Sequence, residues 1–432
     1  MIDPRMGTII LIGSFIGLLI FRFPITFSLF LSSIVTAIYL KIPLMSIVQR
    51  LVNGVSSFSL LAIPFFILSG EIMSQGGISR RLVGFSNALI GWVRGGLAQV
   101  NIIASMFFGG ISGSAVADVS SIGAMLIPMM VDDGYDADFS VAVTVTSACQ
   151  GVLIPPSHNM IIFAMAAGGG VSVGKLFLGG LIPGVGLGLL LMIPTAILAY
   201  MRGYPKQKPY GWKKSLQLAR DAFFGLFTII IIMGGVISGV FTATESASVA
   251  AVYAFIITFF VYREIPLSRM WSILANSLRT LAMVMSLIAA ASSFGYLMAY
   301  LRIPQMVTNG LLTISGNKVV LLLLINLMLL ALGTVMDMAP LIIITTPILF
   351  PVVVGHLGMD PIQFGIMLIL NLTIGLTTPP VGSALFVGCS VGKISIEKAT
   401  KAILPFYVVM VLDLILVTFI PAMSLFLPKV MM

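Results

Sequence analysis

The sequence predicts an all-α polytopic membrane protein with about ten full transmembrane helices and two re-entrant hairpins, arranged as inverted repeats of five helices plus a hairpin. Its composition, its apolar segments and a weak internal repeat predict this fold. Of the 432 residues, 59% are hydrophobic and 9% are charged, whereas about 25% of the residues of a soluble protein are charged. This composition excludes a soluble enzyme, a disordered protein and a nucleic-acid-binding protein. We therefore attribute the net charge of +9 to membrane loops.

The apolar stretches predict the spans, since a helix needs about 20 apolar residues to cross a bilayer. The first stretch has no small-residue cleavage site after it, so we interpret it as a retained helix and not as a signal peptide. Residues 98–131 and 318–355 are apolar but rich in Gly, Ser, Thr and Pro, and we predict that each folds back as a hairpin. The predicted full spans are residues 6–21, 24–40, 58–74, 139–165, 177–201, 221–241, 246–262, 278–300, 363–390 and 403–428.

The basic residues predict the orientation. The polar stretch 202–220 is rich in Lys and Arg, and cytoplasmic loops carry an excess of these residues. Counting ten full spans outward from this stretch places both termini on the outer side of the membrane, which is the periplasm if the resemblance described below holds. Most of the 23 Lys and Arg then lie on the cytoplasmic side, but only if the two Gly-rich stretches are hairpins.

An internal repeat relates the two halves at an offset of about 222–225 residues. QGVLIPP at 150–156 matches IGLTTPP at 374–380, which pairs Gly151 with Gly375. Each motif follows a Gly-rich hairpin. Because five spans per repeat is an odd number, the second copy is inverted relative to the first. Inverted repeats with broken helices are typical of secondary transporters.

The double prolines predict where ions bind. Prolines inside the spans 139–165 and 363–390 remove amide donors and free the carbonyls before them. Free carbonyls together with hydroxyl groups suit a hard cation such as Na⁺. The second copy has Thr377 and Thr378 in this turn. The first copy has no hydroxyl there, so we expect the preceding hairpin to supply them, from Ser112, Ser114, Ser120 and Ser121.

The run GGISGSAVADVSSIG at 109–123 has a second interpretation, because small residues also allow tight helix packing in membranes. Its position beside a broken helix and within a repeat favours binding. Asp118 and Asp337 lie in the two hairpins, and an ionisable residue inside a membrane is a functional candidate. The alternative for both is a cap at a water-exposed hairpin tip.

The remaining acids and possible metal ligands are less informative. Glu245 is either a helix cap or a group at the outer interface, and the sequence assigns no role to Glu71 or Asp413. Two histidines and two cysteines cannot assemble a metal site of the kind enzymes use. We expect no organic cofactor and no ATP hydrolysis, so the driving force must come from an ion gradient or from a partner protein.

The segments AIPFFILSG (62–70), GGISGSAVADVSSIG, GVLIPPSHN, FTATESAS (241–248) and GLTTPPVGSALFVG (375–388) together resemble the large membrane subunit of tripartite ATP-independent periplasmic (TRAP) transporters. The resemblance implies an elevator transporter of the ion-transporter superfamily. It implies a scaffold of residues 1–96 and 218–312, a transport domain of residues 97–202 and 313–432, and a cytoplasmic linker at 203–217. Segments 42–56 and 263–274 are expected to be interfacial arms.

The resemblance also implies the site residues, with two or more Na⁺ as coupling ions. Asp118 and Asp337 match hairpin acids of the family, with a coupling or structural role, and Gly109 stands where a relative carries another Ser. The implied first Na⁺ site comprises Ser112, Ser114, Gly151, Ile154 and Pro155, the second comprises Gly333, Gly375, Thr378 and Val381, and the substrate lies near Ser157, Asn159 and Ser383.

By this resemblance the protein imports small organic acids, such as dicarboxylates, keto acids or sugar acids, across the bacterial inner membrane. Its expected partners are a small four-helix membrane subunit, as a separate chain, and a periplasmic substrate-binding protein. A stand-alone carboxylate carrier of the same superfamily is the main alternative. An integral-membrane enzyme would need clustered His, Asp or Glu, and a channel would not need broken helices in pairs. The sequence does not specify which acid is carried.

Overall fold

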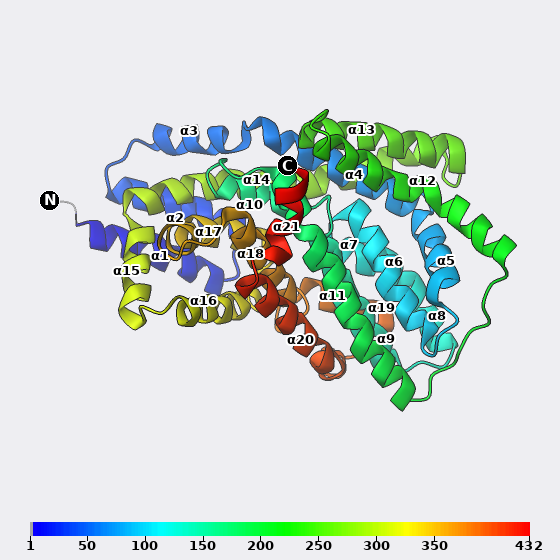
Figure 1. Ribbon diagram of the computed structural model, residues 1–432. Helices are drawn as coiled ribbons and strands as arrows, with labels where there is room; N and C mark the ends of the chain where they lie inside the picture. The colour runs from blue at the N-terminus through cyan, green and yellow to red at the C-terminus, as the bar shows by residue number, and fades with distance from the viewer. Residues whose placement is uncertain (1–2) are drawn as a thin grey trace.

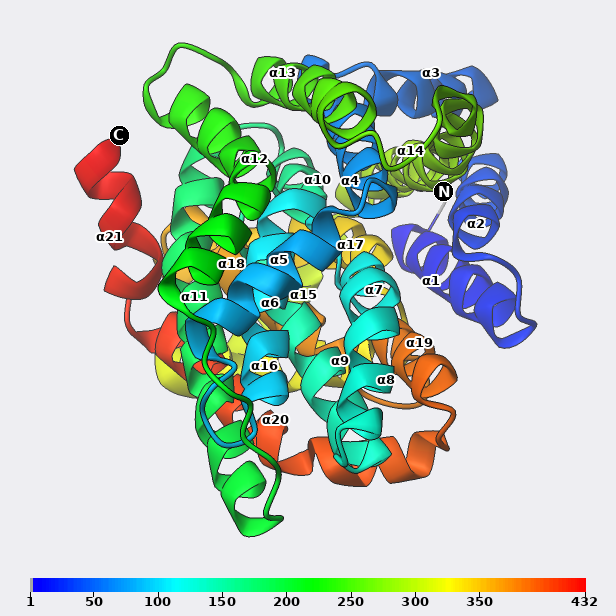
Figure 2. The same cartoon turned by 90° about the vertical axis from the view of Figure 1, so that its right-hand side faces the viewer.

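The computed structural model describes residues 3–432. Within this range the regular elements are helices and no β-strand occurs; one isolated β-bridge joins Arg94 to Lys206. The helices form an elongated bundle, with the N-terminus at one end and the C-terminal helix α21 on the flank (Figures 1 and 2). The first part of the chain comprises α1 (Pro4–Ile20), α2 (Ile25–Tyr39), α3 (Leu44–Val55), a 3₁₀ turn (Phe58–Leu61), α4 (Ala62–Gln75) and α5 (Ile78–Ile90).

The third quarter of the chain packs against this first part. Helices α1 and α2 form a pair, α2 and α3 both contact α14, and α4 contacts α13 and α14. Glu245 completes a capping box with Thr242 at the start of α13, which agrees with the helix-cap interpretation of this acid. This part comprises α12 (Trp212–Ile237), α13 (Ala243–Ile256), a π-helical turn (Ile257–Tyr262), a 3₁₀ turn (Leu267–Arg269), α14 (Met270–Tyr300) and α15 (Ile303–Ile314).

The segment predicted as the first hairpin folds as helix, turn and helix. Helix α6 ends at Gly113, whose φ of +60° is a left-handed conformation that suits glycine. The chain then returns along α6, since Asn101 approaches Met130 near the far ends of the two arms. This region comprises α6 (Gly96–Ser112), α7 (Ala115–Asp118), a π-helical turn (Val119–Gly123), α8 (Ala124–Asp132), α9 (Ala137–Leu153), α10 (His158–Ala166) and α11 (Val173–Met201).

The last quarter of the chain repeats this order. A helix and a returning helix are joined at residues 334–337, and a helix in two parts follows them. The elements are α16 (Lys318–Gly333), α17 (Met338–Phe350), a π-helical turn (Pro351–His356), α18 (Pro361–Gly375), α19 (Ser383–Gly392), α20 (Ile396–Phe419) and α21 (Ala422–Met431).

The centre of the core is formed by the first parts of the two broken helices. Helix α9 is buried at every residue from Phe139 to Leu153, and α18 is buried from Ile362 to Gly375. Both helices are therefore covered on all sides by other helices. Helix α6 covers α9 and α16 covers α18, while α11 and α20 pack against both. Polar groups on α9 and α18 therefore have only protein around them.

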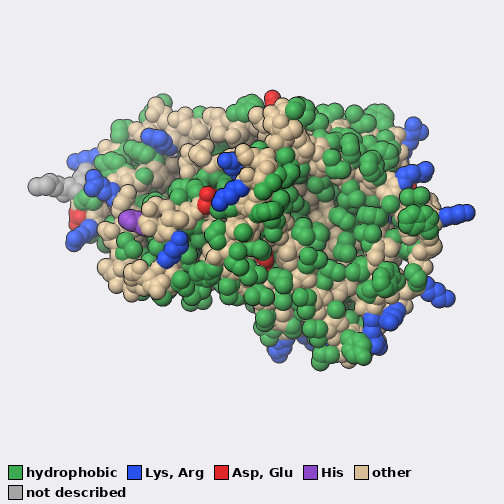
Figure 3. Space-filling view, in the orientation of Figure 1, with side chains coloured by type: hydrophobic (Ala, Val, Ile, Leu, Met, Phe, Trp, Pro, Cys, Tyr) green, Lys and Arg blue, Asp and Glu red, His purple; other side chains and the backbone are tan. Residues whose placement is uncertain are grey.

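The surface and the helix lengths agree with a multi-pass membrane protein. Hydrophobic side chains cover most of the face in Figure 3, and many Lys and Arg lie at its edges. Within residues 3–432, eight helices are long and apolar enough to cross a membrane, or nine if the bent pair α9–α10 is one span. These eight include the returning arms Ala115–Asp132 and Met338–His356, whereas α1 and α2 are shorter apolar helices.

Two boundaries differ from the sequence prediction. The span predicted at 403–428 ends at Phe419, because Ile420 is extended and Pro421 begins the separate helix α21. The span predicted at 278–300 begins earlier, because α14 starts at Met270, directly after the 3₁₀ turn, and includes the last residues of the segment 263–274. The segment 42–56 does form its own helix, α3, whose one fully buried side chain is Ile47.

Candidate functional site

Two glycine pairs join each hairpin to the broken helix that follows it. A Cβ atom on Gly109 would overlap the backbone of Gly151, and one on Gly375 would lie 2.7 Å from the Cα of Gly333. Gly333 and Gly375 lie 224 residues after Gly109 and Gly151, respectively. Cys149 and Thr373 are separated by the same 224 residues, and the Cys149 thiol lies 3.5 Å from Thr373 O. The two halves therefore build the same backbone contact from corresponding residues.

Both broken helices are interrupted next to these glycines. Helix α9 stops at Leu153 and α10 starts at His158, with a bend of 52°. Helix α18 stops at Gly375 and α19 starts at Ser383. The Pro155–Pro156 and Pro379–Pro380 peptide bonds are both cis. Helix α10 packs against α17 of the second hairpin, and α19 packs against the returning arm of the first, so each break adjoins both halves.

The first break leaves its carbonyl groups free. Pro155 and Pro156 supply no amide protons, and none of the described donors reaches the carbonyl oxygens of residues 151–156. The Pro156 carbonyl faces Gly113 at the hairpin tip, and Leu153 O faces Gly180 of α11. These oxygens remain available as ligands in a buried position.

The second break uses its carbonyl groups internally. The Thr377 and Thr378 hydroxyls donate to Ile374 O at 2.7 and 2.9 Å, and the Tyr407 hydroxyl donates to Thr377 O at 2.6 Å. Backbone amides bond the other carbonyls from Gly375 to Thr378, so these oxygens have partners, whereas none of the described donors reaches the carbonyls of Pro379 and Pro380. These bonds are Thr378 N to Gly375 O at 3.0 Å, Ala384 N to Leu376 O at 3.2 Å and Gly382 N to Thr378 O at 3.1 Å.

The residues predicted for the first Na⁺ site lie at one junction. Ser112 and Ser114 flank Gly113, where a Cβ atom would lie 3.1 Å from the Cα of Ser157. Ser114 also caps α7, because its Oγ accepts from the Ala117 amide at 3.4 Å. Ile154 contacts the other side of the hairpin at Gly110. A Ser at position 109, as the resemblance expects in a relative, has no room here because the Gly151 backbone occupies the place of its Cβ.

The residues predicted for the second Na⁺ site also meet. Gly333 touches Gly375, and the Val381 amide donates to Thr334 O at the hairpin tip at 3.0 Å. The Thr378 hydroxyl is engaged with Ile374 O but keeps its lone pairs. Val381 itself is exposed. No ligand tests either set, and both remain predictions.

The two hairpin acids occupy different environments. Asp118 on α7 is fully buried, so the interpretation of a water-exposed cap is wrong for this residue. Asp337 is exposed at the second turn, where the Ser383 hydroxyl donates to its carboxylate at 3.2 Å. By the repeat offset Asp337 corresponds to Gly113, so the two acids lie in corresponding hairpins but not at corresponding positions.

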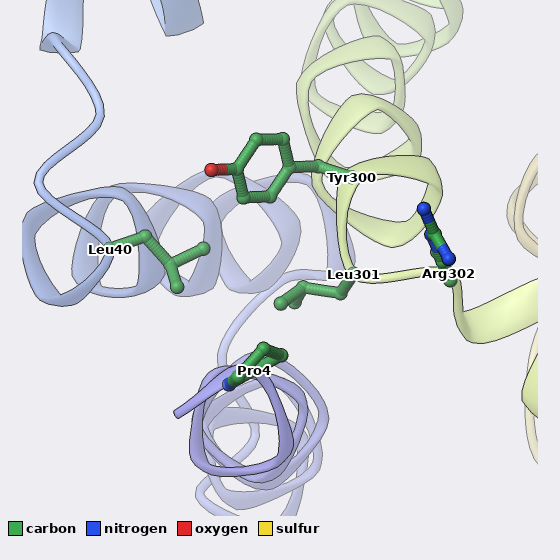
Figure 4. A pocket seen from close by; sticks show the side chains of 5 residues that line it. All are labelled: Pro4, Leu40, Tyr300, Leu301 and Arg302. Atoms are coloured by element: carbon green, nitrogen blue, oxygen red, sulfur yellow. The ribbon is translucent and has the colours of Figure 1, made fainter. Parts of the chain in front are cut away.

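The residues predicted near the substrate lie at the breaks. Ser157 is buried and its hydroxyl has no hydrogen-bond partner among the described residues, and Asn159 is buried in the first turn of α10. Ser383 starts α19. A cavity of 410 Å³ in Figure 4 lies elsewhere, where the ends of α1, α2 and α14 meet. A smaller one of 180 Å³ lies between α10, α14 and α17 and includes Ile162 and Ser292.

Sequence reasoning missed a buried polar layer between each hairpin and its broken helix. Asn101 accepts from the Ser147 hydroxyl at 3.4 Å, and Asn371 donates to Asn326 Oδ1 at 2.9 Å. Asn101 and Asn326 lie on the first arms of the two hairpins. The separation of Asn101 and Asn326 in the sequence falls within the offset range of the internal repeat. This match could have identified the two asparagines as corresponding residues from the sequence alone.

The sequence family described as the tripartite ATP-independent periplasmic transporter, DctM component, matches residues 12–423. A Vibrio cholerae protein named C4-dicarboxylate TRAP transporter large permease protein is 40% identical over 96% of each chain. The sialic acid TRAP transporter large permease protein of the same organism is 38% identical over 97% of each chain.

A solved structure, the YdaH transporter of Alcanivorax borkumensis, has a TM-score of 0.61 with 14% identity, covering 87% of this chain and 88% of its own, which shows a shared fold. The family match across residues 12–423 and the two long alignments identify the chain itself. The chain belongs to the TRAP transporter family, as its large permease subunit.

Proposed function

We propose that this subunit is the translocating part of a Na⁺-coupled importer of small organic acids that works by an elevator mechanism. The observation that carries the proposal is the first break, where free carbonyls of residues 151–156 lie against the hairpin tip at Ser112 and Ser114. Unwound carbonyls between half-helices coordinate coupling ions in secondary transporters. The chemistry supports Na⁺, because neutral oxygens suit a hard cation.

The second break supports a second Na⁺ site at Gly333, Gly375, Thr378 and Val381, although its oxygens are engaged in this state. The corresponding glycine contacts in the two halves support an inverted repeat. We therefore assign the hairpins and broken helices to the moving transport domain of residues 97–202 and 313–432. Residues 1–96 and 218–312 form the scaffold, and 203–217 the linker.

The relatives support an anionic substrate, since one is named for C4-dicarboxylates and another for sialic acid. Ser157 and Ser383 stand at the starts of α10 and α19, where backbone amides favour negative charge. The unpartnered Ser157 hydroxyl offers a hydrogen bond to a carboxylate. We propose that the acid binds between these two helix starts.

The family implies two partners, a small membrane subunit and a periplasmic binding protein, and we propose that both are needed here. The test is uptake into proteoliposomes that contain both membrane subunits, with the cognate binding protein outside and an inward Na⁺ gradient. A panel of dicarboxylates, sialic acid, keto acids and sugar acids identifies the substrate. Uptake that persists when choline replaces Na⁺ would refute the coupling. Uptake without the binding protein would favour a stand-alone carrier.

Two variants test the ion sites in the same assay. Ser112→Ala and Thr378→Val each remove one proposed ligand, and we expect the Na⁺ concentration for half-maximal uptake to rise about tenfold for each. Ser120→Ala and Thr400→Val are matched controls, because these hydroxyls bond only to a carbonyl of their own helix. If Na⁺ dependence is the same in all four variants, the assignment of ligands is wrong.

The proposed orientation places the linker of residues 203–217 in the cytoplasm and both termini in the periplasm. Pro209 is exposed in this linker, and the two native cysteines are buried. A Pro209→Cys variant should therefore react with an impermeant thiol reagent in inside-out vesicles of the inner membrane and not in intact spheroplasts. Labelling in spheroplasts would reverse the topology.

A further inference from the structure

Asp118 is a buried acid that neither proposed Na⁺ site uses. Its side chain has no exposed surface, and within the described residues neither carboxylate oxygen has a hydrogen-bond partner. The helices that pack against α7 are α6, α9 and α19, and none of them carries a Lys, Arg or His. Among these three helices the one acidic residue is Asp138, which lies at the far end of α9. No side chain of opposite charge therefore balances a carboxylate at this position.

A buried carboxylate needs a compensating charge or a proton, because the protein interior solvates an ion poorly. Compensation by a bound cation would require further oxygen atoms around Asp118. The polar groups around Asp118 therefore determine whether a cation or a proton balances its charge.

The neutral oxygen next to this carboxylate is the Ser105 hydroxyl of α6, and the Cys149 thiol of α9 also lies nearby. Ser105 in turn connects the carboxylate to polar groups of α6 and α9. The Ser147 Oγ lies 3.3 Å from Ser105 Oγ and 3.4 Å from Asn101 Oδ1. Ser105, Ser147 and Asn101 are all fully buried. With the two carboxylate oxygens, Ser105, Ser147 and Asn101 offer a set of oxygen ligands closed to the surface.

Such a ligand set has the chemistry of a site for a hard monovalent cation. One carboxylate with hydroxyl and amide oxygens matches the preference of Na⁺ and leaves the site electrically neutral. A transition-metal site would need several charged or soft ligands, and the described residues contain no group of three His, Cys, Asp or Glu placed to hold a metal ion. A protonated acid would need only one acceptor, whereas this cluster provides three.

We propose that Asp118, Ser105, Ser147 and Asn101 form an additional Na⁺ site, separate from the two sites at the breaks. The proposal deepens the Na⁺-coupled function proposed above and rests on it. The site is tied to the first break, because the Asp118 amide donates to Ser114 O at 3.0 Å. The cation would thus hold α7 against α6 and α9 on the inner side of the hairpin tip.

The second half has no equivalent site. The residue that corresponds to Asp118 by the repeat offset is Ile342. Asn326 and Asn371, in the corresponding polar layer, bond to each other, and Asn326 also donates to the Thr418 hydroxyl at 3.2 Å. Asn371 Oδ1 has no partner among the described residues, but no acid lies in that layer, so it holds no charge that a cation would have to balance. We expect one additional Na⁺, which gives three per transport cycle.

The test counts bound and transported Na⁺ for the full membrane complex. Equilibrium binding of ²²Na⁺ to the purified complex gives the number of sites, and the charge moved per substrate in proteoliposomes gives the number transported. We expect Asp118→Asn, which keeps the shape and removes the charge, to lose one bound Na⁺ and one transported Na⁺. Ser147→Ala, a small change that is expected to fold, should weaken one class of site about tenfold.

Other outcomes are equally informative. If wild-type uptake does not depend on Na⁺, the proposed function fails. If the wild type is Na⁺-dependent but both variants keep its Na⁺ count and affinity, the additional site alone fails. A loss of pH dependence in Asp118→Asn, with the Na⁺ count intact, would show that a proton occupies Asp118 and would also overturn this site. Ser112→Ala serves as the comparison, since it should weaken the first site and leave the additional site loaded.

Discussion

The two broken helices share their glycines and prolines, yet one break is open and the other is closed. Carbonyls of residues 151–156 have no described donor, whereas those of residues 374–378 all accept hydrogen bonds. The difference follows from the donors that reach each turn. In the second break, backbone amides donate to Gly375 O, Leu376 O and Thr378 O, and the Tyr407 hydroxyl donates to Thr377 O. Proline creates the free carbonyls, and the donors that fold back onto the turn determine whether those carbonyls stay free.

This difference has a consequence for ion binding. A cation at the first break finds oxygens without partners, whereas a cation at the second must displace internal hydrogen bonds, each with a net value of about 0.5–1.5 kcal/mol. We therefore expect the first break to bind Na⁺ more tightly than the second. The following predictions test the comparison, beginning with the largest expected effect.

The glycine contacts should be the feature most sensitive to mutation. Gly109→Ala forces a Cβ into the Gly151 backbone, while Gly333→Ala places it 3.1 Å from the Gly375 Cα. Because neither side of these contacts is a flexible side chain, we expect Gly109→Ala to destabilise the protein by about 1–3 kcal/mol and Gly333→Ala by less. Thermal unfolding in detergent measures both, together with Na⁺-dependent uptake.

The matched control for these variants is Gly295→Ala in α14, where an added Cβ meets nothing within 4 Å. That variant should unfold at the wild-type temperature or slightly higher, since alanine favours a helix. Equal stability of Gly109→Ala and Gly295→Ala would show that the hairpin and the broken helix are not in backbone contact.

The closed state of the second break should depend on Tyr407. Tyr407→Phe removes the donor to Thr377 O and leaves that carbonyl unpaired, at a cost of about 1 kcal/mol. A bound Na⁺ can use this oxygen, so we expect Na⁺ to recover part of the lost stability. The measurement is the unfolding temperature with and without Na⁺ at constant ionic strength.

Tyr253→Phe is the control, because the Tyr253 hydroxyl donates to Phe224 O at 3.0 Å, far from either break. Its loss of stability should be independent of Na⁺. If Na⁺ raises the unfolding temperature of both variants equally, Tyr407 does not regulate the second site.

The features that the sequence predicts correctly are local ones. Proline and glycine act on their own segment of backbone, so the breaks after Leu153 and Gly375 and the turn at Gly113 follow from short motifs. The family and the transporter class follow from several such motifs in order. The end of α20 at Phe419 was missed because an apolar run hides a break until Pro421 is taken as a stop signal.

The features that the sequence does not predict depend on contacts between distant segments. Tyr407 and Thr377 are 30 residues apart, and nothing in either segment indicates their hydrogen bond. Asp118 and Asp337 appeared equivalent because both lie in hairpins, but burial depends on the residue-level register and on what packs against each hairpin. The ligand sets for Na⁺ came from resemblance, and they remain predictions until an ion is measured.

Asp337, the exposed acid at the tip of the second hairpin, should contribute little to the stability of the fold. Asp337→Asn keeps a hydrogen-bond acceptor for the Ser383 hydroxyl, so we expect a change in stability within about 0.5 kcal/mol. The Na⁺ count should also stay at the wild-type value, in contrast to Asp118→Asn. Loss of a bound Na⁺ in Asp337→Asn would move the additional ion to the second hairpin.

The smallest effect is expected where the two broken helices begin. Asp136 and Asp360 both precede the first turn, but their partners differ. Asp136 accepts from the Tyr204 hydroxyl at 2.7 Å and from Arg202 at 2.8 Å, whereas Asp360 accepts from the Ile362 amide of its own helix at 2.8 Å. The hydrogen bond from Tyr204, assisted by Arg202, lowers the pKa of Asp136 below its ordinary value.

A lowered pKa in the folded state stabilises the protein above the unfolded pKa of about 3.9, and this stabilisation is lost as the pH falls through the folded pKa. Asp136→Asn should therefore unfold at a lower temperature than the wild type at pH 7, and the gap should narrow below about pH 4. The Asp136 side chain is 59% exposed, and exposed ion pairs contribute at most about 1 kcal/mol, so the gap should be small. Asp360→Asn should show no such gap at either pH, because asparagine caps a helix as well as aspartate does. A gap for Asp136→Asn that persists unchanged at pH 3 would mean that packing of Tyr204, and not the charge of Asp136, fixes the start of the first broken helix.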